Sequence, residues 1–166
     1  MINMAARSTT CSISSFLKTS KLSLNKILNG DIKLNDKNNI NLHVVIGNEA
    51  ADADSIVSAL CCAYIKSMKD SSKSLTTHYV PVCCIPRSDL ILRRDISILF
   101  QLTGLDMNDL ICLDDCKLEL LSKQAKSKTE NLKITLTDHN EISRYWKDDT
   151  VSIESHIIEI IDHHKD

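Results

Sequence analysis

The chain has 166 residues, 43% of them hydrophobic and 25% charged, which is typical of a single globular domain with a buried core. Lys and Arg number 20 against 22 Asp and Glu, so the formal net charge of −2 argues against a protein that binds nucleic acid by charge alone. No apolar run approaches the roughly 20 residues of a membrane-spanning helix. We therefore expect neither nucleic acid nor a membrane as a partner.

The cysteines and the first thirty residues bear on location. Seven cysteines without a CxxC pair or a secretory signal indicate reduced thiols, which makes the cytoplasm the expected location. Residues 1–30 contain no acidic residue and many Ser and Thr, so a mitochondrial transit peptide is the alternative. The apolar spacing of residues 16–28 favours a structural helix that ends near Asn29 and Gly30. The polar residues that follow, 31–41, predict a loop.

Five short apolar segments predict buried strands, and segments with helical spacing lie between them. This alternation is typical of βαβ units and a parallel sheet. The expected strands are 42–46, 78–85, 109–113, 132–137 and 157–161. The expected helices are 54–68, 94–102 before Gly104, and 116–126, with a short helix or turn at 141–149. We therefore expect an α/β fold of three layers, with a mainly parallel five-stranded sheet flanked by helices.

The expected elements also suggest how the chain is organised. A helix and a polar loop occupy residues 1–41, and the α/β domain occupies residues 42–166. The last expected strand ends five residues before the last residue, and no helix follows it. Parallel sheets normally have both faces covered. We therefore expect the domain to be incomplete at its C-terminus.

Acidic and imidazole side chains follow three of the expected strands at their carboxyl ends. Asp52 and Asp54 come after the first strand, Asp138 after the fourth, and His163 and His164 after the fifth. Ligands of open α/β sheets bind beside these strand ends. Carboxylate oxygens with imidazole nitrogen suit Mn²⁺ or Mg²⁺, and two such ions that share a carboxylate can assist displacement at phosphorus. Each segment alone could be a helix cap, a turn or a solvated end; together they predict a metal centre.

Three motifs carry a resemblance to a known superfamily: residues 47–55 (GNEAADADS), 138–141 (DHNE) and 160–164 (IIDHH). Their order and spacing resemble the three N-terminal motifs of the DHH phosphoesterase superfamily. The first motif is similar to the branch of eukaryotic exopolyphosphatases and prune proteins. The arginine-rich residues 85–96 and residues 110–115 also resemble that branch, so the resemblance extends over about residues 14–165.

The resemblance implies two divalent metal ions, Mn²⁺ or Mg²⁺, and a role for the residue at each motif position. Asp52 would bind the first ion, and Asp54 and His163 the second. Asp138 would bridge the two ions, and His164 would contact the reacting phosphate. Asp138 and His164 would therefore be the catalytic residues.

The resemblance also implies supporting residues around the metal ions. Asn48 stands where the pyrophosphatase branch carries a metal-binding histidine, so it would loosen the first metal site and face the substrate. Asp162 and His139 would orient the metal ligands. The candidate phosphate-binding cations are Arg87, Arg93 and Arg94, whose alternative role is surface charge or ion pairing.

The function implied by the resemblance is metal-dependent release of orthophosphate from the end of inorganic polyphosphate. A pyrophosphatase or nucleotide phosphodiesterase of the same superfamily is one alternative, and a catalytically incomplete, prune-like binding module is another. A zinc-binding interaction domain would use His163, His164, Cys112 and Cys116. Superfamily members have a further acidic ligand and a second domain with cationic residues. We find neither in this sequence, so we expect this chain alone to be weakly active or inactive.

Overall fold

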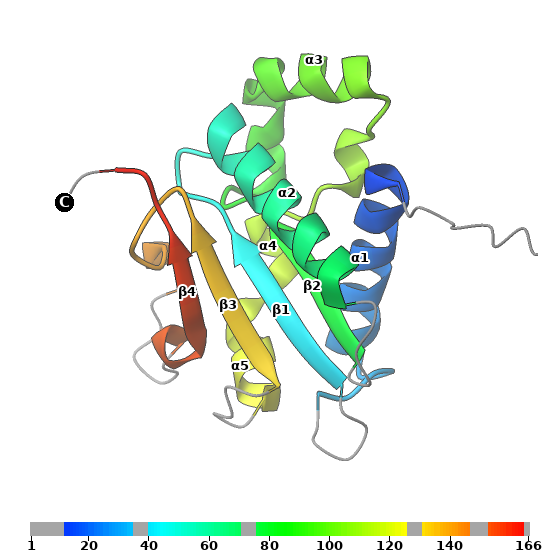
Figure 1. Ribbon diagram of the computed structural model, residues 1–166, viewed down its shortest axis with the longest axis vertical. Helices are drawn as coiled ribbons and strands as arrows, with labels where there is room; N and C mark the ends of the chain where they lie inside the picture. The colour runs from blue at the N-terminus through cyan, green and yellow to red at the C-terminus, as the bar shows by residue number, and fades with distance from the viewer. Residues whose placement is uncertain (1–11, 35–39, 71–75, 126–130, 147–152, 165–166) are drawn as a thin grey trace, which may run out of the picture.

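The computed structural model describes residues 12–34, 40–70, 76–125, 131–146 and 153–164. Within them, four parallel strands form one sheet in the order β2-β1-β3-β4 (Figure 1). The strands are β1 (Ile40–Ile46), β2 (Thr76–Val82), β3 (Leu132–Thr137) and β4 (Ile157–Ile161). The helices are α1 (Ile13–Leu28), α2 (Ala53–Asp70), α3 (Arg94–Thr103), α4 (Leu113–Cys116) and α5 (Leu118–Ala125). The expected α/β class and parallel sheet are confirmed, and the expected number of strands is not.

The predicted third strand, residues 109–113, is wrong. This segment pairs with the chain after β2 through a single bridge between Cys83 and Cys112. A turn of 3₁₀ helix ends at Asp109, and α4 begins at Leu113, so little extended backbone remains between them. The carboxylate of Asp115 accepts the N–H of Cys112 at 2.9 Å and thereby caps α4. The start of α4 uses residues that the predicted strand would need. The spacing of apolar residues in the sequence does not show where α4 starts.

The N-terminal helix is part of the core. α1 begins after Ser12, and Asn29 and Gly30 end it as expected, with Gly30 at a φ of 82°. Its side chains Leu17 and Ile27 are fully buried, and α1 lies along β2 (Figure 1). This burial gives the helix a structural role, whereas residues 1–11 and residues 35–39 of the predicted polar loop lie outside the described residues.

The remaining predicted helices agree with the structure except at their ends. α3 ends before Gly104, which has a φ of 70°. The predicted helix 116–126 is broken at Lys117, whose φ is 43°, so two short helices replace it. Within the predicted short helix or turn at 141–149, Arg144–Trp146 form a 3₁₀ helix. Residues 147–149 lie outside the described residues.

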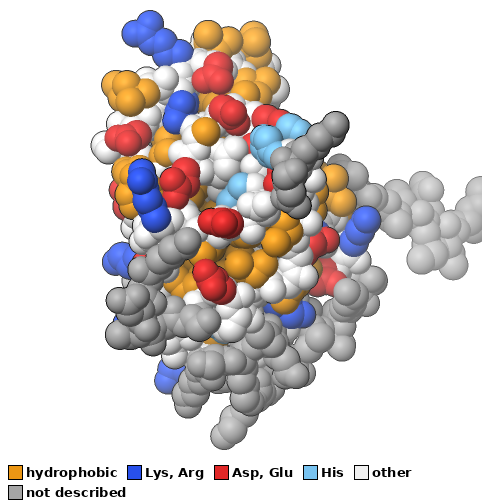
Figure 2. Space-filling model, turned by 90° about the vertical axis from the view of Figure 1, so that its left-hand side faces the viewer, with side chains coloured by type: hydrophobic (Ala, Val, Ile, Leu, Met, Phe, Trp, Pro, Cys, Tyr) orange, Lys and Arg blue, Asp and Glu red, His pale blue; other side chains and the backbone are white. Residues whose placement is uncertain are grey.

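Helices pack on both faces of the sheet, because strand side chains alternate between the faces. Val44 and Ile46 of β1 join one buried cluster with α4 and α5, whereas Val45 joins another with α2 and α3. β4 is one of the two edge strands, and Ile158 and Ile160 on it are about half exposed. Figure 2 shows hydrophobic and acidic side chains side by side on one face of the molecule. Among the described residues, no helix has the length and apolarity needed to cross a membrane.

The strand order positions the functional site. From β1 the chain passes through α2 to β2 on one side, and it then crosses to β3 on the other side of β1. The carboxyl ends of β1 and β3 therefore lie on either side of the point where the winding direction reverses. Open α/β sheets bind their ligands at this point. Asn48 follows β1 closely and Asp138 follows β3 directly.

His43 of β1 is a buried histidine within the sheet. Its Nε2 lies 2.8 Å from the Oγ1 of Thr135, which donates its own proton to Glu159 at 3.1 Å. Because the Thr135 proton is already used, His43 Nε2 must donate in the contact between the two side chains. Burial, with the positive charge of Lys66 as a smaller cause, lowers the pKa of His43 to about 4.

We expect His43 to make the stability of the protein depend on pH. Below pH 6.5 the unfolded chain protonates this imidazole, and the folded chain does so only near pH 4, so the free energy of unfolding decreases as the pH falls. Between pH 7 and pH 5 the decrease due to His43 is about 2 kcal/mol. Urea unfolding should therefore show a smaller decrease for His43→Gln than for the wild type. Equal decreases in the two proteins would contradict this assignment.

Candidate metal centre

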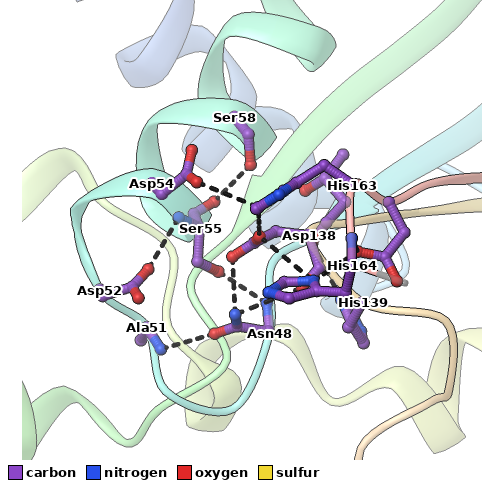
Figure 3. Close-up of polar contacts among 12 residues, drawn as sticks. Asn48, Ala51, Asp52, Asp54, Ser55, Ser58, Asp138, His139, His163 and His164 are labelled. Atoms are coloured by element: carbon purple, nitrogen blue, oxygen red, sulfur yellow. Dashed lines mark hydrogen bonds and ion pairs between the residues drawn. The ribbon is translucent and has the colours of Figure 1, made fainter. Parts of the chain in front are cut away.

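Asp138 is the buried carboxylate of the site. It follows β3, its N–H donates to the carbonyl of Ile161 at 2.8 Å, and its side chain is 5% exposed. Asn48 Nδ2 donates to one carboxylate oxygen at 2.6 Å, and His163 Nε2 lies 3.0 Å from the other (Figure 3). Three segments far apart in the sequence, which follow β1, β3 and β4, therefore meet at one carboxylate.

His163 lies between two carboxylates. Besides its contact with Asp138, its Nε2 is 3.4 Å from the Oδ2 of Asp54, which lies in the first turn of α2 (Figure 3). Both His163 and Asp54 are mostly exposed. This arrangement allows one imidazole and two carboxylates to approach the same cation, and these donors are the ones that Mn²⁺ and Mg²⁺ accept.

His164 completes a group of possible metal ligands. Ligand atoms of Asp138, His163 and His164 all lie within 4.8 Å of one another. The Nδ1 of His164 is 2.6 Å from an oxygen of Asp162, and this hydrogen bond raises the pKa of His164. Asp162 therefore fixes the orientation of the His164 ring.

The loop between β1 and α2 fixes Asn48 by two further hydrogen bonds. The N–H of Asn48 donates to Ser55 Oγ at 2.6 Å, and its side-chain oxygen accepts the N–H of Ala51 at 3.0 Å. The amide nitrogen of Asn48 is thereby directed toward Asp138. In this arrangement Asn48 offers a hydrogen-bond donor to the carboxylate rather than an oxygen to a cation.

Asp52 lies on the same loop and caps α2. Its Oδ1 accepts the N–H of Ser55 at 3.0 Å, and the side chain is exposed (Figure 3). Among the described residues, no hydrogen bond or ion pair joins Asp52 to Asp138 or to the histidines. Its role as a ligand of the first metal ion therefore remains a prediction.

His139 has a free ring nitrogen. Its Nδ1 donates to the carbonyl of Thr137 at 2.9 Å, because that oxygen can only accept. The Nε2 of His139 is then an acceptor, and it is buried without a hydrogen-bond partner among the described residues. A buried imidazole nitrogen that can accept, and that has no hydrogen-bond partner among the described residues, is compatible with a nearby cation. His139 follows Asp138 directly in the sequence.

The three candidate arginines have different surroundings. Arg87 pairs with the carboxylate of Asp115 and donates to the carbonyl of Leu110, and the bond to Asp115 raises its pKa. Arg93 has a buried Nε without a partner among the described residues, and Arg94 is exposed. Among the residues that the structure describes, no hydrogen bond or ion pair joins these arginines to the site. Their phosphate-binding role remains a prediction.

The alternative zinc site does not form among the described residues. Cys112 groups with two aspartates near Arg87, while the histidine pair groups with Asp138. Cys116 is fully buried, and burial raises the pKa of Cys112 to about 11, which disfavours the thiolate that zinc requires. All six cysteines that the structure describes are free.

Sequence reasoning missed one charged residue of the first motif, Glu49. Its Oε1 accepts the hydroxyl of Ser143 at 2.7 Å and the N–H of Arg144 at 3.0 Å. These partners lie more than ninety residues away in the sequence, so no local pattern could have identified them.

Comparison with known proteins identifies similar relatives. Over 122 residues, or 74% of the chain, the sequence is 37% identical to human Exopolyphosphatase PRUNE1 and 37% identical to a putative exopolyphosphatase of Schizosaccharomyces pombe. Bovine Exopolyphosphatase PRUNE1 is 32% identical over the same number of residues. The match covers 24% of the human protein and 28% of the yeast protein, so the chain spans about a quarter of the curated relatives it matches. No protein-family model matches the chain.

Proposed function

This chain belongs to the exopolyphosphatase and prune branch, and we propose that it provides the metal-binding side of a site that hydrolyses inorganic polyphosphate. The observation that carries the proposal is the position of Asp138. Its buried carboxylate lies where the winding of the sheet reverses, and it contacts side chains from the segments after β1 and β4. The relatives are named exopolyphosphatases, and this supports hydrolysis at the end of polyphosphate as the reaction.

Each side chain would have its own role in this reaction. Asp138 would bridge two divalent cations, with Asp52 on the first and Asp54 and His163 on the second. When bound, the cations would supply the positive charge that phosphate oxygens need during displacement. Asn48 holds Asp138 by a hydrogen bond, and His139 and Asp162 orient their neighbours.

The substrate would approach from the exposed side of this group. His164 lies on that side and would contact the reacting phosphate. Arg87, Arg93 and Arg94 are the cations that we propose for the remaining phosphates of the substrate. Pyrophosphate or a nucleotide is the alternative substrate of the same chemistry.

One observation favours a second candidate function, a prune-like binding module. Arg87 is already paired with Asp115, and among the described residues none of the three candidate arginines forms a hydrogen bond or ion pair with a proposed metal ligand. A site with metal ligands and few cations of its own can bind a metal ion without turning a substrate over.

Metal binding and phosphate release test the two candidates together. We expect calorimetry to show saturable Mn²⁺ binding, and Mn²⁺ to support phosphate release from polyphosphate in preference to pyrophosphate. A cyclic nucleotide, whose hydrolysis would give a nucleoside monophosphate, should not be hydrolysed. Release by this chain should be slow, because no described arginine contacts the site, and removal of metal with EDTA should abolish it. Mn²⁺ binding without release from any substrate would favour the binding module. Absence of Mn²⁺ binding would contradict the metal centre itself.

A further inference from the structure

Glu49 connects the two loops that carry the proposed metal ligands. It belongs to the loop between β1 and α2, and its Oε1 accepts hydrogen bonds from the Ser143 hydroxyl and the Arg144 N–H of the segment after β3. The Nε of Arg144 lies 3.8 Å from the other carboxylate oxygen. The two bonds to Oε1 dominate this contact, because an exposed ion pair at the longer distance contributes little.

Glu49 and its neighbour Asn48 hold the same segment at two points. Asn48 bonds to Asp138 at the start of the segment, and Glu49 bonds to Ser143 near its end. Two consecutive residues of one loop therefore fix a stretch of six residues that begins with a proposed metal ligand. The position of that ligand depends on both attachments.

The segment needs external attachment because its backbone is strained. Asp138 has a φ of 66°, in the left-handed region that residues with a side chain rarely adopt. Such a conformation persists only when surrounding contacts determine it. The bond from the Asp138 N–H to Ile161 and the bond from Asn48 are two of these contacts.

Loss of the Glu49 carboxylate would remove acceptors that are difficult to replace. Ser143 is 2% exposed, so its hydroxyl has little access to water. Buried polar groups are almost always hydrogen-bonded, and the N–H of Arg144 depends on the same carboxylate oxygen. Without Glu49, the segment would have to move to satisfy both groups.

We infer that Glu49 is a positioning residue of the proposed metal centre: through Ser143 and Arg144 it holds the segment that begins with Asp138 against the loop that carries Asp52 and leads into α2. The inference rests on the proposed function for its effect on metal binding. The contact between the loops is a separate property and is measured separately.

Amide hydrogen exchange by NMR and Mn²⁺ titration by calorimetry test this inference. In Glu49→Ala, we expect the Arg144 amide to exchange about tenfold faster and the dissociation constant for Mn²⁺ to rise about tenfold. Glu49→Gln retains an oxygen that accepts the same two bonds, so both values should stay near those of the wild type. Asp95→Ala, which removes an exposed carboxylate in the first turn of α3, is the control for charge and should change neither value.

Each other result overturns a defined part of the reasoning. Unchanged Arg144 exchange in Glu49→Ala would overturn the inference. So would faster exchange with an unchanged Mn²⁺ dissociation constant, or equal losses in Glu49→Ala and Glu49→Gln. Absence of Mn²⁺ binding by the wild type, with faster exchange in Glu49→Ala, would contradict the proposed function and uphold the loop contact. Glu49 is 40% exposed, so its alanine variant is expected to fold, and circular dichroism checks this.

Discussion

Asp138→Asn is expected to weaken Mn²⁺ binding by at least about a hundredfold, because changes behind metal ligands alone cost about ten- to a hundredfold. The substitution removes the negative charge and keeps the shape of the side chain. Asparagine is also among the residues that best tolerate a positive φ, so the φ of 66° at this position is retained. The loss should therefore reflect the missing charge rather than a change of fold.

Calorimetric Mn²⁺ titration and Mn²⁺-dependent phosphate release from polyphosphate measure this effect. The matched control is Asp95→Asn, which removes the same charge from an exposed position in the first turn of α3. We expect the control to bind Mn²⁺ like the wild type. If Asp138→Asn retained phosphate release at the wild-type rate, Asp138 would have no part in the mechanism.

The convergence of the site could be predicted from the sequence because it follows from a general property of parallel sheets. The carboxyl ends of parallel strands lie at one edge, so side chains that follow β1, β3 and β4 are brought to the same edge. β1, β3 and β4 are also adjacent in the sheet, which places Asn48, Asp138 and His163 within contact of one another. Only the hydrophobic pattern and the residue types were needed for that prediction.

The rest of the fold depends on contacts that no local pattern contains. Residues 109–113 are apolar enough for a strand, but the carboxylate of Asp115 initiates α4 and removes them from the sheet. Arg87 could serve a phosphate by its charge, but it pairs with Asp115, 28 residues away. Glu49 shows no function in the sequence because its partners follow a different strand.

Gly47→Ala is expected to destabilise the protein by about 3 kcal/mol, the upper part of the range for an overpacked core. A Cβ at this position would lie 2.3 Å from the Oγ of Ser55 and 2.9 Å from its backbone oxygen. Ser55 is 1% exposed in the first turn of α2; its hydroxyl can rotate, but its backbone oxygen cannot move away without a shift of the helix. Gly47 thus allows the loop after β1 to lie close to the N-terminus of α2.

The same substitution should weaken Mn²⁺ binding, because the N–H of Asn48 donates to the Ser55 oxygen that the new methyl group would displace. Urea unfolding and calorimetric Mn²⁺ titration measure the two effects. Gly30→Ala is the control: Gly30 has a φ of 82° and no atom within 4 Å of the added Cβ, so it should lose only about 1 kcal/mol and bind Mn²⁺ normally. Losses of stability that are equal in the two variants would show that the close approach of Gly47 to Ser55 does not limit the fold. A destabilised Gly47→Ala with normal Mn²⁺ affinity would show that the site does not depend on this approach, since Asn48 would then hold Asp138 without its bond to Ser55.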